Sequence, residues 1–234
     1  APEGISDGAP LTDFISCTDY QYHTEPRPNK VFVNMPTAVY SKDLLEGTNA
    51  GGFFTYDNYR NPVEINTIYG TAGSRTEKIA YANNPGEPYY IGRPLSRSTT
   101  LYGGGDSYST EEQYTYSGYL LTGTKRRGHN TPYITETLGY DGFGNLVQQT
   151  VTPSPGSPRT ARYTYDPGGR FMTAQTDADG LTTKWEHNPV TGDLTRETDP
   201  YGVSTRYEYN VWGEHTKVTD FLNRSTITTY NKSK

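Results

Sequence analysis

A pattern that recurs four times between residues 162 and 231 decides the fold. It reads RYTYDPGG at 162–169, KWEHNPVTG at 184–192, RYEYNVWG at 206–213 and TTYN at 228–231. The anchor residues Tyr165, His187, Tyr209 and Tyr230 follow one another at intervals of 22, 22 and 21 residues. A fixed period of this length is typical of repeat proteins, in which each unit packs against its neighbours in the chain.

A second turn signal lies 11 or 12 residues after each anchor, at residues 177–180, 199–202 and 220–223. Each begins with Asp, whose carboxylate can accept hydrogen bonds from the backbone of its own turn. The fourth residue is Gly180, Gly202 or Asn223, the residue types that best tolerate a positive φ. Two turns per unit predict antiparallel hairpins in series.

The residues between the turns alternate as in β-strands. One predicted face carries Val203, Thr205, Tyr207 and Tyr209, and the preceding unit repeats it with Leu181, Thr183, Trp185 and His187. We expect these aromatic residues to form a packing ladder across neighbouring strands.

Anchors of the same kind extend upstream at looser intervals, at Tyr140, Tyr116, Tyr81 and Tyr56. We therefore divide the chain into an irregular or β-type segment at 1–53 with a weak repeat match, degenerate repeats with loop inserts at 54–139, and regular repeats at 140–234. Eight units of two strands predict roughly 16–18 strands. Gly103–Gly105 and residues 153–158 are interpreted as irregular inserts.

The predicted site residues are structural positions of the repeat. They are Tyr140, Asp141, Gly144, Tyr163, Tyr165, Asp166, Gly169, Asp177, Gly180, Trp185, His187, Gly192, Asp199, Gly202, Tyr207, Tyr209, Gly213, Asp220 and Tyr230.

Composition and charge exclude several classes of protein. The chain of 234 residues has 22 Tyr and 25 Gly, which suits strands and turns, and contains no apolar run long enough for a transmembrane helix. Its net charge of −5 argues against binding a nucleic-acid backbone. The basic cluster Lys125-Arg126-Arg127 is interpreted as a solvated loop.

The sequence carries no catalytic, cofactor or metal signature. Cys17 is the sole cysteine, which excludes an intramolecular disulfide and a paired-cysteine zinc site. The stretch from Asp177 to Gly180 begins like a calcium loop, but Asn188 stands where the bidentate Glu is required. Nucleophile-elbow, phosphate-loop and dinucleotide motifs are absent from the sequence. We predict a protein that is not an enzyme and needs no cofactor.

The combination of Tyr-x-Tyr-Asp-x-x-Gly and Asp-x-x-Gly turns resembles the RHS, or YD-repeat, family. The resemblance covers 54–231 and includes the segments 54–62 and 91–98, although Arg60 stands where the family has Gly. The family includes secreted bacterial polymorphic toxins and insecticidal toxin-complex components, and teneurins carry similar repeats. The resemblance implies a β-ribbon wound in a curved spiral that forms a hollow shell around a polypeptide. The self-cleaving C-terminal motif of many members is not reproduced here.

Size limits what this chain could enclose by itself. At about 4.8 Å per strand, the sheet would be about 80 Å wide and would roll into a cylinder about 26 Å across. A folded domain of about 100 residues has a diameter above about 30 Å. We therefore expect a segment of a larger shell.

The expected function is architectural, in a bacterial protein that is secreted or at the cell surface and encapsulates or delivers a toxin polypeptide. The expected partners are further repeats or shell subunits and an enclosed polypeptide. The alternative is a cell-surface module whose Tyr face binds a glycan or a protein.

Overall fold

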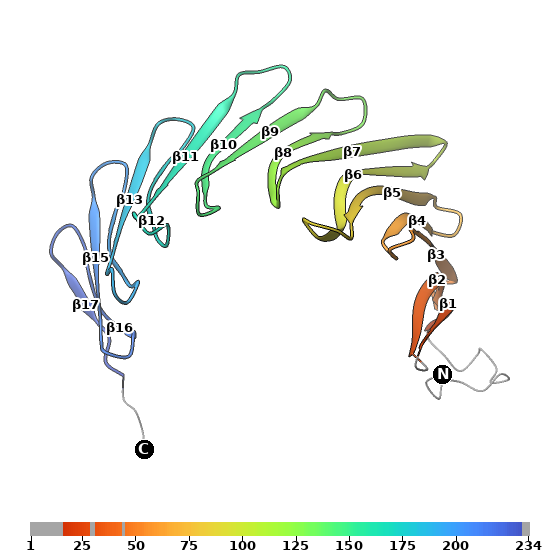
Figure 1. Ribbon diagram of the computed structural model, residues 1–234, viewed down its shortest axis with the longest axis horizontal. Coiled ribbons are helices and arrows are strands. Elements are labelled where there is room, and N and C mark those ends of the chain that lie inside the picture. Colours follow the sequence, from red (N-terminus) through yellow and green to blue (C-terminus); the bar gives the residue numbers. More distant parts are fainter. Residues whose placement is uncertain (1–15, 29–30, 44, 231–234) are drawn as a thin grey trace. The chain divides into compact units, whose positions relative to one another are not determined.

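The protein is all-β. In a computed structural model that describes residues 16–28, 31–43 and 45–230, seventeen antiparallel strands belong to one sheet (Figure 1). The bounds are β1 Ser16–Arg27, β2 Val31–Asp43, β3 Thr48–Tyr56, β4 Pro62–Ile68, β5 Ser74–Asn84, β6 Tyr90–Gly103, β7 Asp106–Ser117, β8 Leu120–Arg127, β9 Ile134–Tyr140, β10 Leu146–Thr152, β11 Arg159–Tyr165, β12 Met172–Thr176, β13 Thr182–His187, β14 Leu194–Thr198, β15 Ser204–Tyr209, β16 His215–Thr219 and β17 Ser225–Ile227. The predicted series of antiparallel hairpins is confirmed.

The chain divides into two compact units. The first unit comprises residues 1–118 and 124–133, and the second comprises residues 119–123 and 134–234. Within the first unit, β1 to β7 pair in chain order through strands of 7 to 14 residues. Every connection joins strands that are neighbours in the sequence, as expected for a meander of hairpins.

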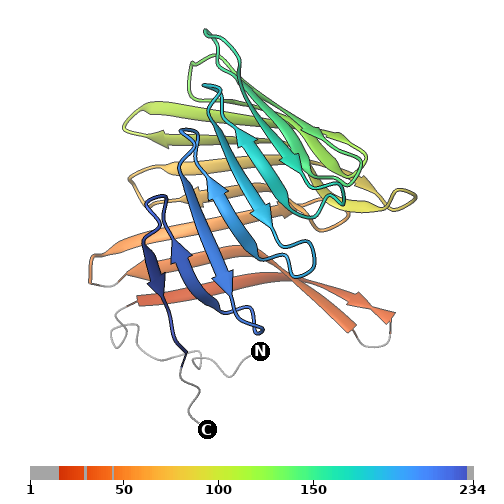
Figure 2. The same cartoon turned by 90° about the vertical axis from the view of Figure 1, so that its left-hand side faces the viewer.

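The second unit contains the regular repeats. Strands β9 to β17 also pair in chain order, but β11 to β17 have only three to seven residues (Figure 2). These strands are short because a turn-forming Asp or Asn occurs at both ends of each hairpin. The repeat period of 22 residues is therefore two short strands and two turns.

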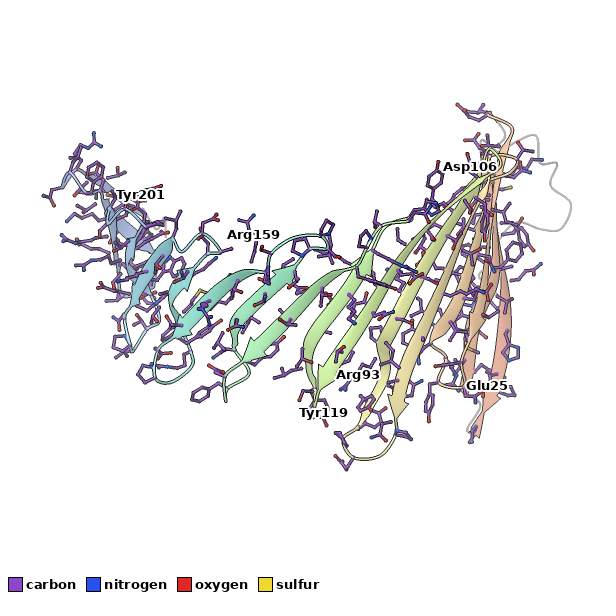
Figure 3. The ribbon with its side chains drawn as sticks, turned by 90° about the horizontal axis from the view of Figure 1, so that it is seen from above. Glu25, Arg93, Asp106, Tyr119, Arg159 and Tyr201 are labelled. Atoms are coloured by element: carbon purple, nitrogen blue, oxygen red, sulfur yellow. The ribbon has the colours of Figure 1, made fainter. Side chains whose placement is uncertain are left out.

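Neither unit has a conventional hydrophobic core in its described part. Ala38 and Glu77, each 4% exposed, are the buried residues, and many large apolar side chains are exposed. Side chains project from both faces of the strands (Figure 3). Cross-strand contacts on a single layer, rather than burial between layers, therefore stabilise each unit.

Glu77 is buried because two arginines pair with it. Arg75 lies 2.5 Å from one carboxylate oxygen, and Arg97 bonds the other from the neighbouring strand β6. Without these cations, the desolvation of the carboxylate would be costly. Next to this cluster, burial, the hydrogen bond to Glu112 and the charge of that carboxylate raise the pKa of Tyr114 to about 12.

Two predictions about loops were wrong. Lys125–Arg127 forms the end of strand β8, and the side chain of Arg127 pairs with Glu111 at 2.5 Å. Gly103 ends β6 and pairs with Asp106, so Gly104 and Gly105, with φ of 63° and 91°, make a tight hairpin turn rather than an irregular insert. Two successive residues with positive φ are the requirement of such a turn.

Candidate functional site

The candidate site is the set of repeat positions, beginning with the turn after each anchor. Asp141 Oδ1 accepts hydrogen bonds from the backbone N–H groups of Phe143 and Asn145, both at 2.9 Å. Asn210 Oδ1 does the same for Trp212 and Glu214, at 2.9 and 3.0 Å. The four predicted glycines of these turns have positive φ: Gly144 at 88°, Gly169 at 66°, Gly192 at 83° and Gly213 at 74°.

The second turn of each unit is built in the same way. In each, the Oδ1 atom of the first Asp accepts two backbone N–H bonds: Asp177 from Asp179 and Leu181, Asp199 from Tyr201 and Val203, and Asp220 from Leu222 and Arg224, at 2.8–2.9 Å. The fourth residues Gly180, Gly202 and Asn223 have φ of 84°, 84° and 60°. A type I turn followed by one left-handed residue closes each hairpin.

Asp166 is the most strongly perturbed carboxyl of these turns. The backbone N–H of Phe171 bonds its carboxylate at 2.9 Å, and that of Arg170 does so at 2.6 Å. These bonds, led by that of Phe171 and reinforced by the Arg170 guanidinium, lower the pKa of Asp166 to about 2. The carboxylate is thus held in its charged form by hydrogen bonds that only the folded turn supplies.

Four of the anchor tyrosines bond a backbone carbonyl of a preceding strand through their hydroxyl groups. Tyr165 donates its hydroxyl hydrogen to the carbonyl of Leu146 at 3.2 Å, and Tyr230 donates to His215 at 3.1 Å. Tyr140 and Tyr56 make the same kind of bond, to Leu121 at 2.7 Å and Pro36 at 2.8 Å. The acceptors of Tyr165 and Tyr230 are the first residues of β10 and β16, at the same end of the hairpins.

His187 occupies the anchor position of its unit without making this bond. The imidazole ring stacks on Phe171 with a centroid distance of 5.2 Å, and its buried Nδ1 has no hydrogen-bond partner among the described residues. By register, the carbonyl left without an anchor hydroxyl is that of Met172, the first residue of β12. The shorter His cannot supply the anchor hydroxyl, and among the described residues the hydroxyl of the next anchor, Tyr209, makes no such bond either.

The predicted aromatic ladder is mixed rather than built from tyrosine pairs. Tyr207 and Tyr209 both contact the ring of His215, at centroid distances of 5.4 and 5.2 Å. On the same face, the hydroxyl of Tyr163 donates to Gln149 at 3.1 Å and that of Tyr207 donates to Glu197 at 3.3 Å. Burial, with the charge of Glu197, raises the pKa of Tyr207.

A β-bulge in each regular unit was not predicted. The register shifts between Thr164 and Tyr165, between Glu186 and His187, and between Glu208 and Tyr209, which leaves one extra residue on the partner strand: Thr173, Thr195 and Thr216. Thr195 and Thr216 donate their hydroxyls to the carbonyls of Glu186 and Glu208, at 2.9 and 3.0 Å. The sequence signal was a Thr seven or eight residues after each anchor.

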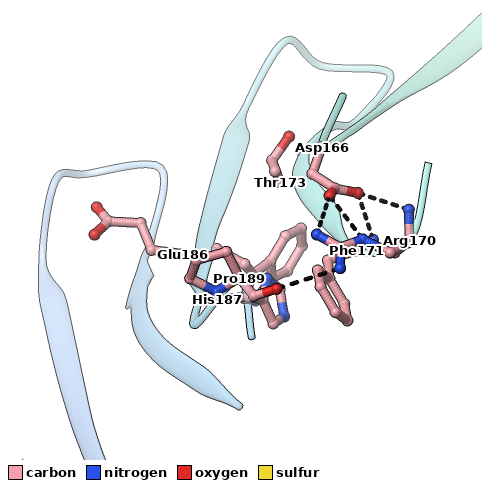
Figure 4. A pocket seen from close by; sticks show the side chains of 8 residues that line it. Asp166, Arg170, Phe171, Thr173, Glu186, His187 and Pro189 are labelled. Atoms are coloured by element: carbon pink, nitrogen blue, oxygen red, sulfur yellow. Dashed lines mark hydrogen bonds and ion pairs between the residues drawn. The ribbon is translucent and has the colours of Figure 1, made fainter. Parts of the chain in front are cut away.

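These bulges lie beside two pockets that the repeat places in equivalent positions. One, of about 360 Å³, is lined by Trp185, His187, Phe171 and Thr173, with Arg170 bonded to Asp166 and to the carbonyl of Pro189 (Figure 4). The other, of about 420 Å³, is lined by Tyr207, Tyr209, Thr195 and Asp193. Trp185 and His187 of the first pocket thus correspond to Tyr207 and Tyr209 of the second, 22 residues later.

The described part of the chain has neither a cluster of metal-ligating side chains nor a membrane-spanning helix. Within 16–28, 31–43 and 45–230, no group of three or more His, Cys, Asp or Glu residues could hold a metal ion. Over the same residues, no helix has the length and apolar character needed to cross a membrane.

The fold and its repeated turns define the class of protein, an antiparallel sheet of consecutive β-hairpin repeats.

No protein-family model matches the sequence, and no curated protein matches it significantly. Three solved structures share the fold over 88% of this chain: TcdB2-TccC3 without its hypervariable C-terminal region (TM-score 0.59, 17% identity), TcdB2-TccC3-Cdc42 (0.60, 16%) and the Photorhabdus luminescens Tc holotoxin pore (0.58, 17%). The chain spans 10% of the length of each matched chain.

Proposed function

We propose that this chain is a segment of the β-sheet wall of a secreted bacterial RHS-type toxin shell that encapsulates or delivers a polypeptide. The observation that carries this proposal is the match of 88% of the chain to a tenth of the TcdB2-TccC3 chain. The repeat residues then have an architectural role, in which capped turns and anchor bonds join each hairpin to the next.

The scarcity of buried residues supports this role. A single-layer sheet with two buried residues in its described part leaves apolar side chains such as Val190 and Val211 89% and 94% exposed. Such exposure is costly for an independent domain but is expected where further protein covers the surface. Further repeats and shell subunits are the proposed partners.

Binding of a ligand through the Tyr face has less support. The hydroxyl of Tyr207 already bonds Glu197, and the rings of Tyr207 and Tyr209 pack against His215. The same contacts have a simpler explanation as cross-strand packing.

The test uses the complete gene product that contains this chain. A protease site is placed in the segment encoded farthest downstream, and its cleavage is timed in the intact protein, in the denatured protein and in a free peptide. Enclosure predicts strong protection only in the intact protein. Cleavage of the intact protein at the rate of the free peptide would exclude encapsulation.

A further inference from the structure

The strand face opposite Trp185 and Tyr207 in the second unit repeats one set of polar residues three times. We name it the hydroxyl face and define it by Arg162, Thr176, Thr182, Lys184, Thr198, Ser204, Arg206, Thr219 and Ser225. Cross-strand pairing places Arg162 opposite Thr176, Lys184 opposite Thr198, and Arg206 opposite Thr219. Each repeat therefore contributes one cation and two hydroxyls.

The hydroxyls of each repeat bond to each other. The oxygen–oxygen distance is 2.8 Å for Thr176 and Thr182, 2.9 Å for Thr198 and Ser204, and 3.0 Å for Thr219 and Ser225. A hydroxyl pair uses one hydrogen in the mutual bond and keeps a second hydrogen and free lone pairs for another partner.

None of the three cations has an acidic partner in the described part of the chain. Within the described residues, Lys184 and Arg206 form no ion pair or hydrogen bond, and Arg162 donates only to the neutral amide oxygen of Gln148 at 2.7 Å. All three are exposed. The glutamates on the same face of β13 and β15 are already paired, Glu186 with Arg196 at 3.0 Å and Glu208 with Lys217 at 2.9 Å. The face is therefore positive, although the chain carries a net charge of −5.

The spacing of these cations is regular. Arg162, Lys184 and Arg206 lie on β11, β13 and β15, and by register each is two strands across and two residues along the strand from the next, which corresponds to about 12 Å. A pocket of about 350 Å³ lies at the middle repeat and is lined by Thr182, Lys184 and Thr198 together with the turn at Asp199. Asp199 Oδ1 is occupied by two backbone N–H groups of its own turn.

We propose that the hydroxyl face binds a linear acidic polysaccharide. A row of unpaired cations at a constant separation complements a stiff polymer with an acidic group in each repeat, and the hydroxyl pairs match its hydroxyl and carboxylate oxygens. Single-stranded nucleic acid is disfavoured because the residues that define this face include no aromatic ring on which a base could stack. This site is separate from the proposed enclosure of a polypeptide.

The test measures binding of the full chain to polygalacturonate at low salt, with neutral dextran and poly-glutamate as the other probes. The variant combines Arg162→Gln, Lys184→Gln and Arg206→Gln. The matched control, Lys78→Gln with Lys125→Gln and Arg126→Gln, removes the same charge from exposed residues of the first unit. We expect the hydroxyl-face variant to weaken polygalacturonate binding about tenfold, with the control unchanged and binding weakened by salt.

Other outcomes would overturn the proposal. These are no binding to polygalacturonate at low salt, equal losses in both triple variants, or tighter binding of poly-glutamate with the same dependence on Lys184. If the triple variant does not fold, two further variants test the proposal. One is the single change Lys184→Gln, and the other is the charge-preserving pair Lys184→Arg and Arg206→Lys. The single change should weaken binding and the pair should retain it, whereas the reverse result contradicts the proposal.

Discussion

At the scale of single residues, one carboxylate or amide oxygen organises each turn by accepting two backbone N–H bonds. Asn188 and Asn210 do this without a charge, so the geometry of the cap does not need a carboxylate. At Asp166 the charge adds to the geometry, because its N–H donors and Arg170 favour the ionised form. Replacing Asp166 by Asn therefore removes the charge of the cap and keeps an oxygen that can accept its hydrogen bonds.

The first prediction concerns acid stability. The pKa of Asp166 falls from 3.8 to about 2 on folding, so its ionised form stabilises the folded state above pH 3.8. This contribution is lost as the pH falls through about 2, where the folded carboxylate also becomes protonated. The variant Asp166→Asn keeps a cap oxygen and should lose less stability than the parent between pH 4 and pH 2 in urea unfolding. Asp179→Asn is the control, and identical pH profiles for Asp166→Asn and the parent would contradict the prediction.

The second prediction concerns the missing anchor bond. His187→Tyr would supply a hydroxyl to the carbonyl of Met172, as Tyr165 does for Leu146. One added hydrogen bond in place of an unpaired ring nitrogen should raise the free energy of unfolding by about 1 kcal/mol. His187→Phe, which adds the ring without the hydroxyl, is the matched control. Equal melting temperatures for the Tyr and Phe variants would show that no anchor bond forms.

At the scale of elements, the hairpin is the unit of this fold, and its turns, anchor and bulge all lie at strand ends. Strand length is set by the distance between turn signals. The turns and the strand lengths could be predicted from local sequence. The bulge could not, because the extra Thr is identified only by the shift in its pairing with the neighbouring strand.

The third prediction tests the turn conformation. Gly202 has φ of 84° and open space around the position of a Cβ atom, so the cost of Gly202→Val comes from the backbone and not from a clash. We expect a loss of about 1–3 kcal/mol in the free energy of unfolding. Gly142, in the turn at Asp141, also has open space but no positive φ, so Gly142→Val is the control and should cost much less. Equal effects of the two changes would contradict the assignment of strain to Gly202.

At the scale of the whole molecule, we expect the exposed apolar side chains to determine whether copies of the chain associate. Val190 and Val211 lie in turns at the same end of the regular hairpins, and both are almost fully exposed. Exposed apolar side chains on a sheet without a covering layer favour association.

The fourth prediction is that the isolated chain self-associates. Sedimentation velocity should show a sedimentation coefficient that rises with concentration, and this rise should be smaller in the isosteric variant Val190→Thr with Val211→Thr. Thr191→Val, which adds apolar surface in the same turn, should increase it. A concentration-independent monomer for the parent chain would contradict this prediction.

The sequence by itself determined the all-β class, the hairpin series and the position of every regular turn, because Asp, Asn and Gly act through the backbone within a few residues. It misjudged Lys125–Arg127, whose residues look like one basic cluster but alternate between the two faces of β8. Only the tertiary structure decided which distant residues meet. Arg162, Lys184 and Arg206 form a row because strand pairing brings together residues that are 22 positions apart, and the burial of Glu77 likewise depends on an arginine from another strand. Such contacts depend on register across strands, which a local pattern does not encode.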